Sequence, residues 1–148
     1  MKKKITLLLI LTILLTGCGK DHNTIECIKA DKQSSNTMIL TLGENDEVTK
    51  VETIMDAYTG TQYQDRDYNK QKEVYKVFNE VKGMNSSVEK LGIDSLRVRI
   101  NLIYNDLDID EAKDKLEGLI SDESYIIKKG INFEDFSKTY LNGYACKK

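Results

Sequence analysis

Proline is absent from this 148-residue chain, so no turn relies on the fixed backbone φ angle of a proline ring. Histidine occurs once, at His22, ahead of the first patterned segment. A histidine-based nucleophilic triad, a histidine general base and a multi-histidine metal site are therefore excluded from the folded part. Because metal sites need several ligands, we interpret His22, which follows Asp21, as a solvated linker residue.

The chain also lacks an apolar run long enough to cross a membrane as a helix, which takes about 20 residues. Its longest aliphatic run, Ile5–Leu15, is shorter than that and follows the basic head Met1–Lys4. A basic head before a short apolar core is typical of a secretory signal peptide. We therefore predict that residues 1–17 are a signal peptide and are removed.

The apolar run ends in Leu15-Thr16-Gly17-Cys18, which resembles the lipobox of bacterial lipoproteins. The resemblance implies a diacylglycerol joined to the thiol of Cys18 by a thioether, after which Cys18 is the mature N-terminus. Two acyl chains hold a protein stably on a bilayer, whereas one chain holds it only marginally. We therefore expect a protein anchored to the cell membrane on its extracytoplasmic face.

Removal of 17 residues from the 148 leaves 131, which is enough for a single domain with its own core. We predict a tether at residues 18–23 and one domain at residues 24–148. Beyond Cys18 the tether reaches at most about 18 Å, at ~3.5 Å per residue. The domain is therefore expected to lie close to the membrane surface.

Positive charge is not in excess in this protein. The formal net charge is −2, and loss of the signal peptide removes three lysines and no acids, which leaves −5. Phosphate binding needs clustered Lys and Arg, and here the basic residues alternate with acids, so nucleic acid is not an expected partner. Anionic lipid repels an acidic protein, so we expect the lipid anchor rather than electrostatics to hold it.

Cysteine is scarce as well, with three residues at Cys18, Cys27 and Cys146. Lipidation uses Cys18 and leaves a pair, with one cysteine near each end of the expected domain. In an exported protein an even remainder indicates a disulfide bond. The alternative is two buried free thiols that act as small apolar residues.

Hydrophobic periodicity predicts an α+β fold, an antiparallel sheet with about three helices packed on one face. The segment Asn85–Leu91 is expected to be a further strand, joined by a turn at Gly92–Asp94, with a helical turn at Ser87–Leu91 as the alternative. The other predicted strands are Thr24–Ala30, Asn36–Leu42, Glu47–Tyr58 and Leu96–Tyr104. The predicted helices are Arg66–Lys82, one capped by Asp110 that ends near Ser121, and one capped by Asn132 that ends at Gly143.

With this order of elements, the chain resembles the YehR-like family of small bacterial lipoproteins, whose function is unassigned. The resemblance covers most of the mature chain. It rests on the lipobox, the strand-turn-strand around Gly43–Val51, the central helix, and a tail in which Lys128-Lys129-Gly130-Ile131 leads into a helix ending at Gly143-Tyr144. None of these is a catalytic motif, so the resemblance implies a fold and a location without active-site residues.

An acidic segment matches part of a calcium-binding loop. Asp106, Asp108 and Asp110 stand at alternate positions, and Glu117 occupies the twelfth position of such a loop. Glu111 stands at the sixth position, where calcium loops have a glycine. The same segment is also consistent with a strand end that leads into a capped helix, because acids are favoured at helix N-termini.

Two further groups are candidate ligand-binding residues. Tyr58 and Tyr63 lie in an uncharged segment and could stack on a sugar or grip a peptide, although connectors are often built this way. Arg97 and Arg99 are expected to point away from the core and could bind an acidic ligand. The alternative is the solvated side of a half-buried strand.

The sequence has no phosphate-binding loop, thioredoxin-like cysteine pair or pair of glycosidase acids. We therefore expect a non-catalytic binding or interaction module of the cell envelope, without a cofactor. Its partner would be an envelope protein or a small ligand. A calcium-dependent structural module is the first alternative, and a carboxylate-based hydrolase is the second.

Overall fold

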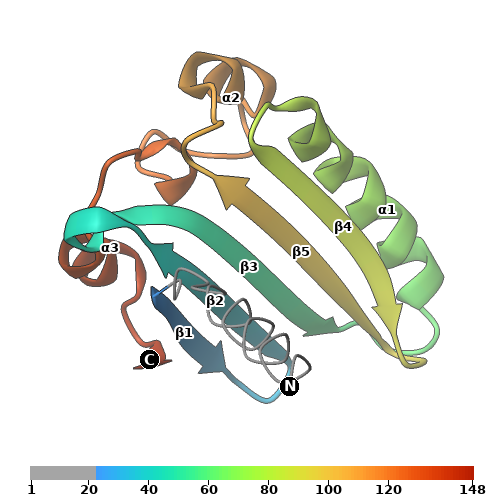
Figure 1. The fold of residues 1–148 in the computed structure, drawn as a ribbon. Helices are drawn as coiled ribbons and strands as arrows, with labels where there is room; N and C mark the ends of the chain where they lie inside the picture. Colours follow the sequence, from blue (N-terminus) through green and yellow to red (C-terminus); the bar gives the residue numbers. More distant parts are fainter. Residues whose placement is uncertain (1–22) are drawn as a thin grey trace, which may run out of the picture.

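The computed structural model of this protein describes residues 23–148, which form one six-stranded antiparallel sheet (Figure 1). The strand order is β4-β5-β3-β2-β1-β6. The strands are β1 (Asn23–Ala30), β2 (Ser34–Leu42), β3 (Val48–Tyr58), β4 (Met84–Leu91), β5 (Ser95–Ile103) and β6 (Ala145–Lys147). The predicted signal peptide, the lipidation site Cys18 and the lone histidine His22 lie outside the described residues.

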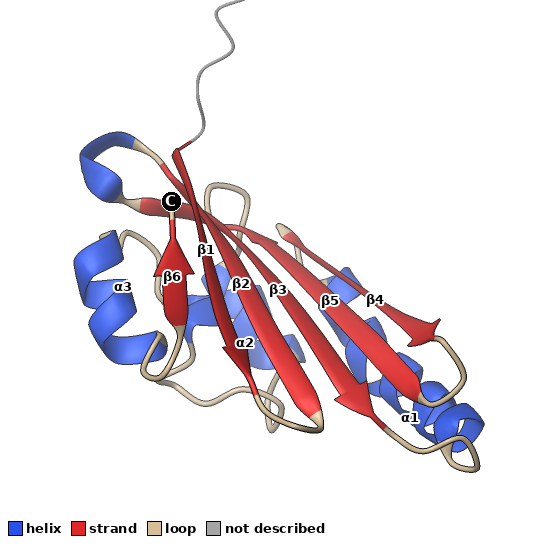
Figure 2. Ribbon diagram, turned by 90° about the horizontal axis from the view of Figure 1, so that it is seen from below, coloured by secondary structure: helices blue, strands red, loops and turns tan. Residues whose placement is uncertain are grey.

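The helices of the described part lie on one face of the sheet, as Figure 2 shows. They are α1 (Gln64–Lys76), α2 (Ile109–Lys115) and α3 (Phe133–Tyr140), with short 3₁₀ turns at Glu44–Asp46, Val77–Glu80 and Tyr125–Ile127. Helix α1 runs beside β4 at one side of the sheet, and α3 lies toward β6 at the other (Figure 1, Figure 2). This arrangement confirms the predicted α+β fold.

The core lies between the sheet and these helices because successive side chains of a strand point to opposite faces. In β5, Leu96, Val98, Ile100 and Leu102 are buried, and the residues between them point to the outer face. Tyr104 and Phe136 are the largest fully buried side chains of the described residues. No helix in the described part is long and apolar enough to span a membrane.

Strand β4 settles the alternative for residues 85–91, because it pairs with β5 along its whole length. The predicted strand is therefore confirmed, and the alternative of a helical turn is wrong. The sequence reading also missed β6, which pairs with β1 at the sheet edge and is only three residues long. A strand of that length carries too little periodicity to be recognised from sequence.

Several helix boundaries differ from the predictions. Helix α1 ends at Lys76, ahead of the predicted Lys82, and a 3₁₀ turn follows it. Helix α2 is capped by Asp108, whose side chain accepts a hydrogen bond from the backbone N–H of Glu111, so the predicted cap at Asp110 is wrong. Three acids stand at alternate positions there, and each could have served as the cap. The same helix ends at Lys115, well before Ser121.

The predicted disulfide between Cys27 and Cys146 is present and joins β1 to β6. The two cysteines are directly opposite in the strand register, so the bond holds the end of the chain against its first strand. Cys27 is fully buried, whereas Cys146 is exposed at the sheet edge. Because the two residues are 119 positions apart, the bond restricts a large part of the unfolded chain.

Replacing both cysteines, Cys27→Ala with Cys146→Ala, is expected to lower the free energy of unfolding by about 2–5 kcal/mol. The loss follows from the greater conformational entropy of an unfolded chain without the cross-link. Urea unfolding followed by circular dichroism measures it. Reductant should destabilise the wild-type protein by a similar amount and leave the double variant unchanged; equal stability of reduced and oxidised wild type would contradict the expectation.

Candidate functional site

The four carboxylates of the predicted calcium loop are not brought together. Asp108 is occupied as the cap of α2, with its Oδ1 atom 3.0 Å from the backbone nitrogen of Glu111. Asp106, Asp110 and Glu117 are exposed. Across residues 23–148, no group of three or more His, Cys, Asp or Glu side chains is placed to hold a metal ion. The spacing that suggested a calcium site therefore reflects the helix N-terminus.

Arg97 and Arg99 lie on the outer face of the sheet, as expected, and both are engaged with carboxylates. Arg97 binds Asp56 with two parallel hydrogen bonds, Nε to Oδ1 at 2.6 Å and Nη2 to Oδ2 at 2.7 Å. Hydrogen bonding from Arg97 lowers the pKa of Asp56. Arg99 makes longer contacts, 3.4 Å to Glu89 and 3.6 Å to Glu52. The two arginines thus bridge neighbouring strands and are not free cations.

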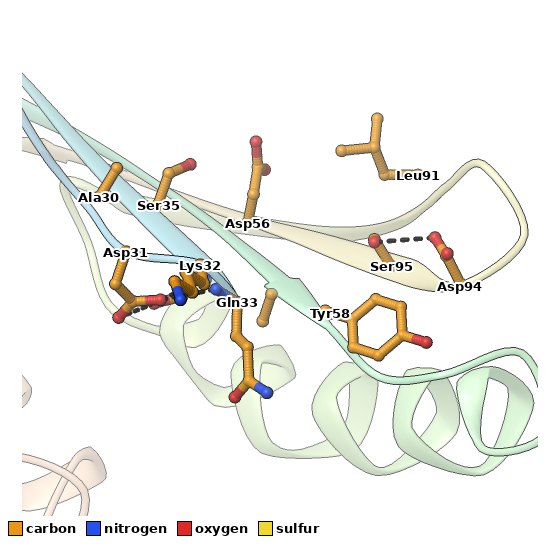
Figure 3. Close-up of a pocket in the computed structure, with 12 residues that line it drawn as sticks. Ala30, Asp31, Lys32, Gln33, Ser35, Asp56, Tyr58, Leu91, Asp94 and Ser95 are labelled. Carbon is orange, nitrogen blue, oxygen red and sulfur yellow. Dashed lines mark hydrogen bonds between the residues drawn. The ribbon is translucent and has the colours of Figure 1, made fainter.

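Tyr58 and Tyr63 are exposed but do not form one surface pocket. Tyr58 lines an open hollow of about 350 Å³ at the end of the β1–β2 hairpin, together with Asp31 and Asp94 (Figure 3). These acids serve local turns: Asp31 accepts backbone hydrogen bonds that lower its pKa, and Asp94 accepts from the hydroxyl of Ser95. The Tyr63 ring instead contacts Arg66, whose guanidinium carbon lies 4.6 Å from the centre of the ring.

A larger cavity, of about 440 Å³ and also open to solvent, lies on the inner face of the sheet and was not predicted from the sequence. Its floor is formed by inward-facing residues of three strands, Asn36, Met38, Thr53, Met55 and Ile100. One wall comes from Tyr75 of α1 and Phe78 of the following turn. The opposite wall comes from the segment 119–126 with Tyr140 of α3 and Tyr144.

The polar groups of this cavity are uncharged. Thr53 and Tyr125 share a hydrogen bond of 2.9 Å, and Tyr104 donates to the backbone oxygen of Tyr125 at 2.5 Å, which fixes the tyrosine-bearing turn above the sheet. Burial raises the pKa of Tyr125 and of Tyr75, so their hydroxyls stay protonated at neutral pH. Asn36 differs, because its Oδ1 atom is buried without a hydrogen-bond partner.

Four of the eight tyrosines line the cavity: Tyr75, Tyr125, Tyr140 and Tyr144. They come from a helix, a 3₁₀ turn, a second helix and the C-terminal tail, so no local spacing connects them. The one sequence signal was Asn36, a polar residue on the inward face of a strand that continues with Met38, Leu40 and Leu42. A polar residue at such a position is a candidate site residue.

No protein-family model and no curated protein matches the chain, but solved structures share its fold. The solved structure of the Escherichia coli YehR protein superposes with a TM-score of 0.65 at 12% identity, covering 86% of this chain and 92% of that one. The solved structure of a protein from Streptococcus pneumoniae superposes with a TM-score of 0.59 at 13% identity, covering 87% of this chain and 88% of that one. The chain therefore has a YehR-like fold.

The ion pair on the outer face gives a pH-dependent expectation. Asp56→Asn should lower the free energy of unfolding at pH 7 by about 1 kcal/mol, the range of partly exposed pairs. Because folding lowers the pKa of Asp56, the stabilisation is fully present above the unfolded-state pKa of about 3.9 and is lost as pH falls from there through the lower pKa of the folded state.

Urea unfolding of wild type and Asp56→Asn at pH 7 and pH 3 measures this difference. Glu89→Gln, which removes a longer and more exposed contact to Arg99, is the matched control and should change stability much less. If the free energy of unfolding differs between wild type and Asp56→Asn by the same amount at both pH values, the ion pair is not the source of the difference.

Proposed function

We propose that this chain is a lipid-anchored lipoprotein of the YehR-like family that acts as a non-catalytic binding module on the extracytoplasmic face of the cell membrane. Three features support the anchoring and location. They are the lipobox ending at Cys18, the YehR-like fold, and a disulfide bond of the kind that persists in oxidising compartments.

The inner-face cavity is the single observation that carries the binding role. Ligand pockets are typically about 300–1,000 Å³ and combine apolar walls with a few polar groups. The cavity of about 440 Å³ has this character, with Met38, Met55 and Phe78 beside Thr53 and Asn36. We propose that it holds the small ligand of this module.

The position of the anchor sets the orientation of the domain. Strand β1 begins at Asn23, opposite Leu42, so the short tether places this end of the sheet toward the bilayer. With a rise of about 3.3 Å per residue, the eight residues of β1 carry the other end roughly 26 Å farther away. The hollow beside Tyr58 would then face away from the membrane.

Acylation of Cys18 is tested by intact-mass analysis of protein purified from its bacterial host. We expect the mass of a chain beginning at Cys18 plus a diacylglycerol, and recovery in the membrane fraction. Cys18→Ala should keep the signal peptide or appear soluble without acyl chains, because the acceptor thiol is gone. Unmodified Cys18 in a soluble wild-type protein would refute the anchor.

The binding role is tested with a small-molecule extract of the host envelope. Bound ligand stabilises the folded state by mass action, so the extract should raise the melting temperature of the wild type by several degrees. Met55→Trp fills the cavity and should abolish the shift. Ile54→Trp, which places the same ring on the opposite face, should keep it; an equal shift in both variants would refute the role of the cavity.

A further inference from the structure

We propose that the open edge of β4 binds an extended acidic peptide segment of a partner protein, which joins the sheet as a further antiparallel strand. This surface goes beyond the binding role proposed for the inner-face cavity. The inference follows from three properties of the edge. They are its free backbone groups, a hollow that runs along them, and two lysines that face the hollow.

The two edges of the sheet are protected to different degrees. Strand β6 forms one edge and has only three residues, and very short edge strands discourage further pairing. Strand β4 forms the other edge with eight residues, and its pairing with β5 continues along the whole strand without a bulge. A long and regular edge presents a row of backbone groups to which another strand can bond.

Backbone groups point outward at every second residue of β4, because an antiparallel neighbour bonds only to alternate residues. At Ser86 these groups are already paired. Asn79 accepts from the N–H of Ser86 at 2.6 Å and donates to its carbonyl at 3.2 Å, as a neighbouring strand would. Val88 and Lys90 follow in the same orientation, and the hydrogen bonds of the described residues include none to their outward groups.

A hollow of about 330 Å³, open to solvent, follows this edge. It is lined by Ser86, Ser87 and Val88, and the side chains of successive strand residues point to opposite faces. The hollow therefore lies along the backbone of β4 rather than on one face of the sheet. Helix α1 runs beside the strand and forms the other wall with Tyr68, Lys72, Tyr75 and Lys76 (Figure 1).

Positive charge gathers at this hollow, although the protein as a whole is acidic. Lys72 and Lys76 are the charged residues that line it. Neither lysine forms an ion pair with a carboxylate of residues 23–148. Because complementary charge favours the correct partner, the segment that binds here is expected to be acidic.

The spacing of the two lysines fits a strand with acids at alternate positions. Four residues of a helix rise about 6 Å, and two residues of a strand advance about 6.8 Å. Residues directly opposite each other in an antiparallel pair point to the same face, so peptide residues opposite Val88 and Lys90 turn their side chains toward the α1 face. These residues are the acids, and their N–H groups bond to β4.

The test titrates the peptide acetyl-Thr-Glu-Thr-Glu-Thr-Glu-Thr-amide into the ¹⁵N-labelled full chain in phosphatidylcholine nanodiscs, observed by NMR. The backbone amide signals of Val88 and Lys90 should shift saturably, whereas that of Met38 in β2 should stay unchanged. A peptide with glutamine in place of glutamate should bind about tenfold more weakly, the effect of two exposed ion pairs. Sodium chloride should weaken binding of the glutamate peptide, because salt screens exposed charges.

Variants of the protein test the two lysines. Lys72→Ala with Lys76→Ala should weaken the glutamate peptide about tenfold and leave the glutamine peptide unchanged. Lys70→Ala is the matched control, because Lys70 is an exposed lysine of the same helix that does not line the hollow. Two residues turn a helix by about 200°, so Lys70 points away from the side of Lys72. The unchanged Met38 signal reports that each variant is folded.

N-methylated peptides test the pairing of backbones. Methylation of the glutamate nitrogens removes the donors that bond to β4 and should abolish binding. Methylation of the threonine nitrogens, which point away from β4, should retain it.

Four results would overturn the inference. They are the absence of saturable shifts at Val88 and Lys90, equal binding of the glutamate and glutamine peptides, and equal binding of the two N-methylated peptides. The fourth is a Val88 signal that shifts with protein concentration in the absence of peptide, which would mark the edge as a contact between copies of this chain. Each would leave the role of the inner-face cavity standing, because that role is tested by Met55→Trp.

Discussion

The pairing of β3 with β5 is the constraint on which the rest of this structure depends. It joins the antiparallel strands β1, β2 and β3 to the hairpin formed by β4 and β5. It also places Thr53 opposite Ile100 on the inner face and Asp56 opposite Arg97 on the outer face. Side chains alternate along a strand, so a slip of one residue would exchange the two faces. The core, the cavity floor and the outer ion pair all require this one register.

The width of the sheet explains why a cavity exists. Six strands spaced about 4.8 Å apart span roughly 24 Å, whereas a helix with its side chains is about 10 Å across. Helix α1 covers the side near β4, and α3 lies toward β6 (Figure 2). The floor between them is covered by a 3₁₀ turn, held by the bonds of Tyr125 to Thr53 and of Tyr104 to the turn's backbone. A short turn fills less volume than a helix, and space remains beside it.

The YehR-like fold sets the positions of the strands and helices, whereas the residues of the candidate site depend on the individual chain. At 12% and 13% identity, superposition transfers the strand order and the helix positions but not the side chains. A fold can host unrelated functions, because recognition depends on the groups grafted onto it. In this chain those groups are tyrosines, methionines and the amide of Asn36, and none of the residues that line the cavity is charged.

Sequence alone determined the features that depend on neighbouring residues. Strand alternation in β5 and the cap of α3 by Asn132 are set by residues within a few positions of one another, and both are confirmed. The cysteine pair was also inferred from sequence, because only two cysteines remain after lipidation. Among the acids before α2, by contrast, local spacing did not distinguish Asp108 from Asp110 as the cap.

Only the tertiary structure decided the candidate site. Asn36, Tyr75 and Tyr140 are distant in sequence and carry no shared spacing, and they meet because sheet pairing and helix packing bring their elements together. The same holds for the partners of Arg97, since an outward position alone does not show which carboxylate lies opposite. Local periodicity reports which face a side chain occupies, whereas long-range packing decides what it meets there.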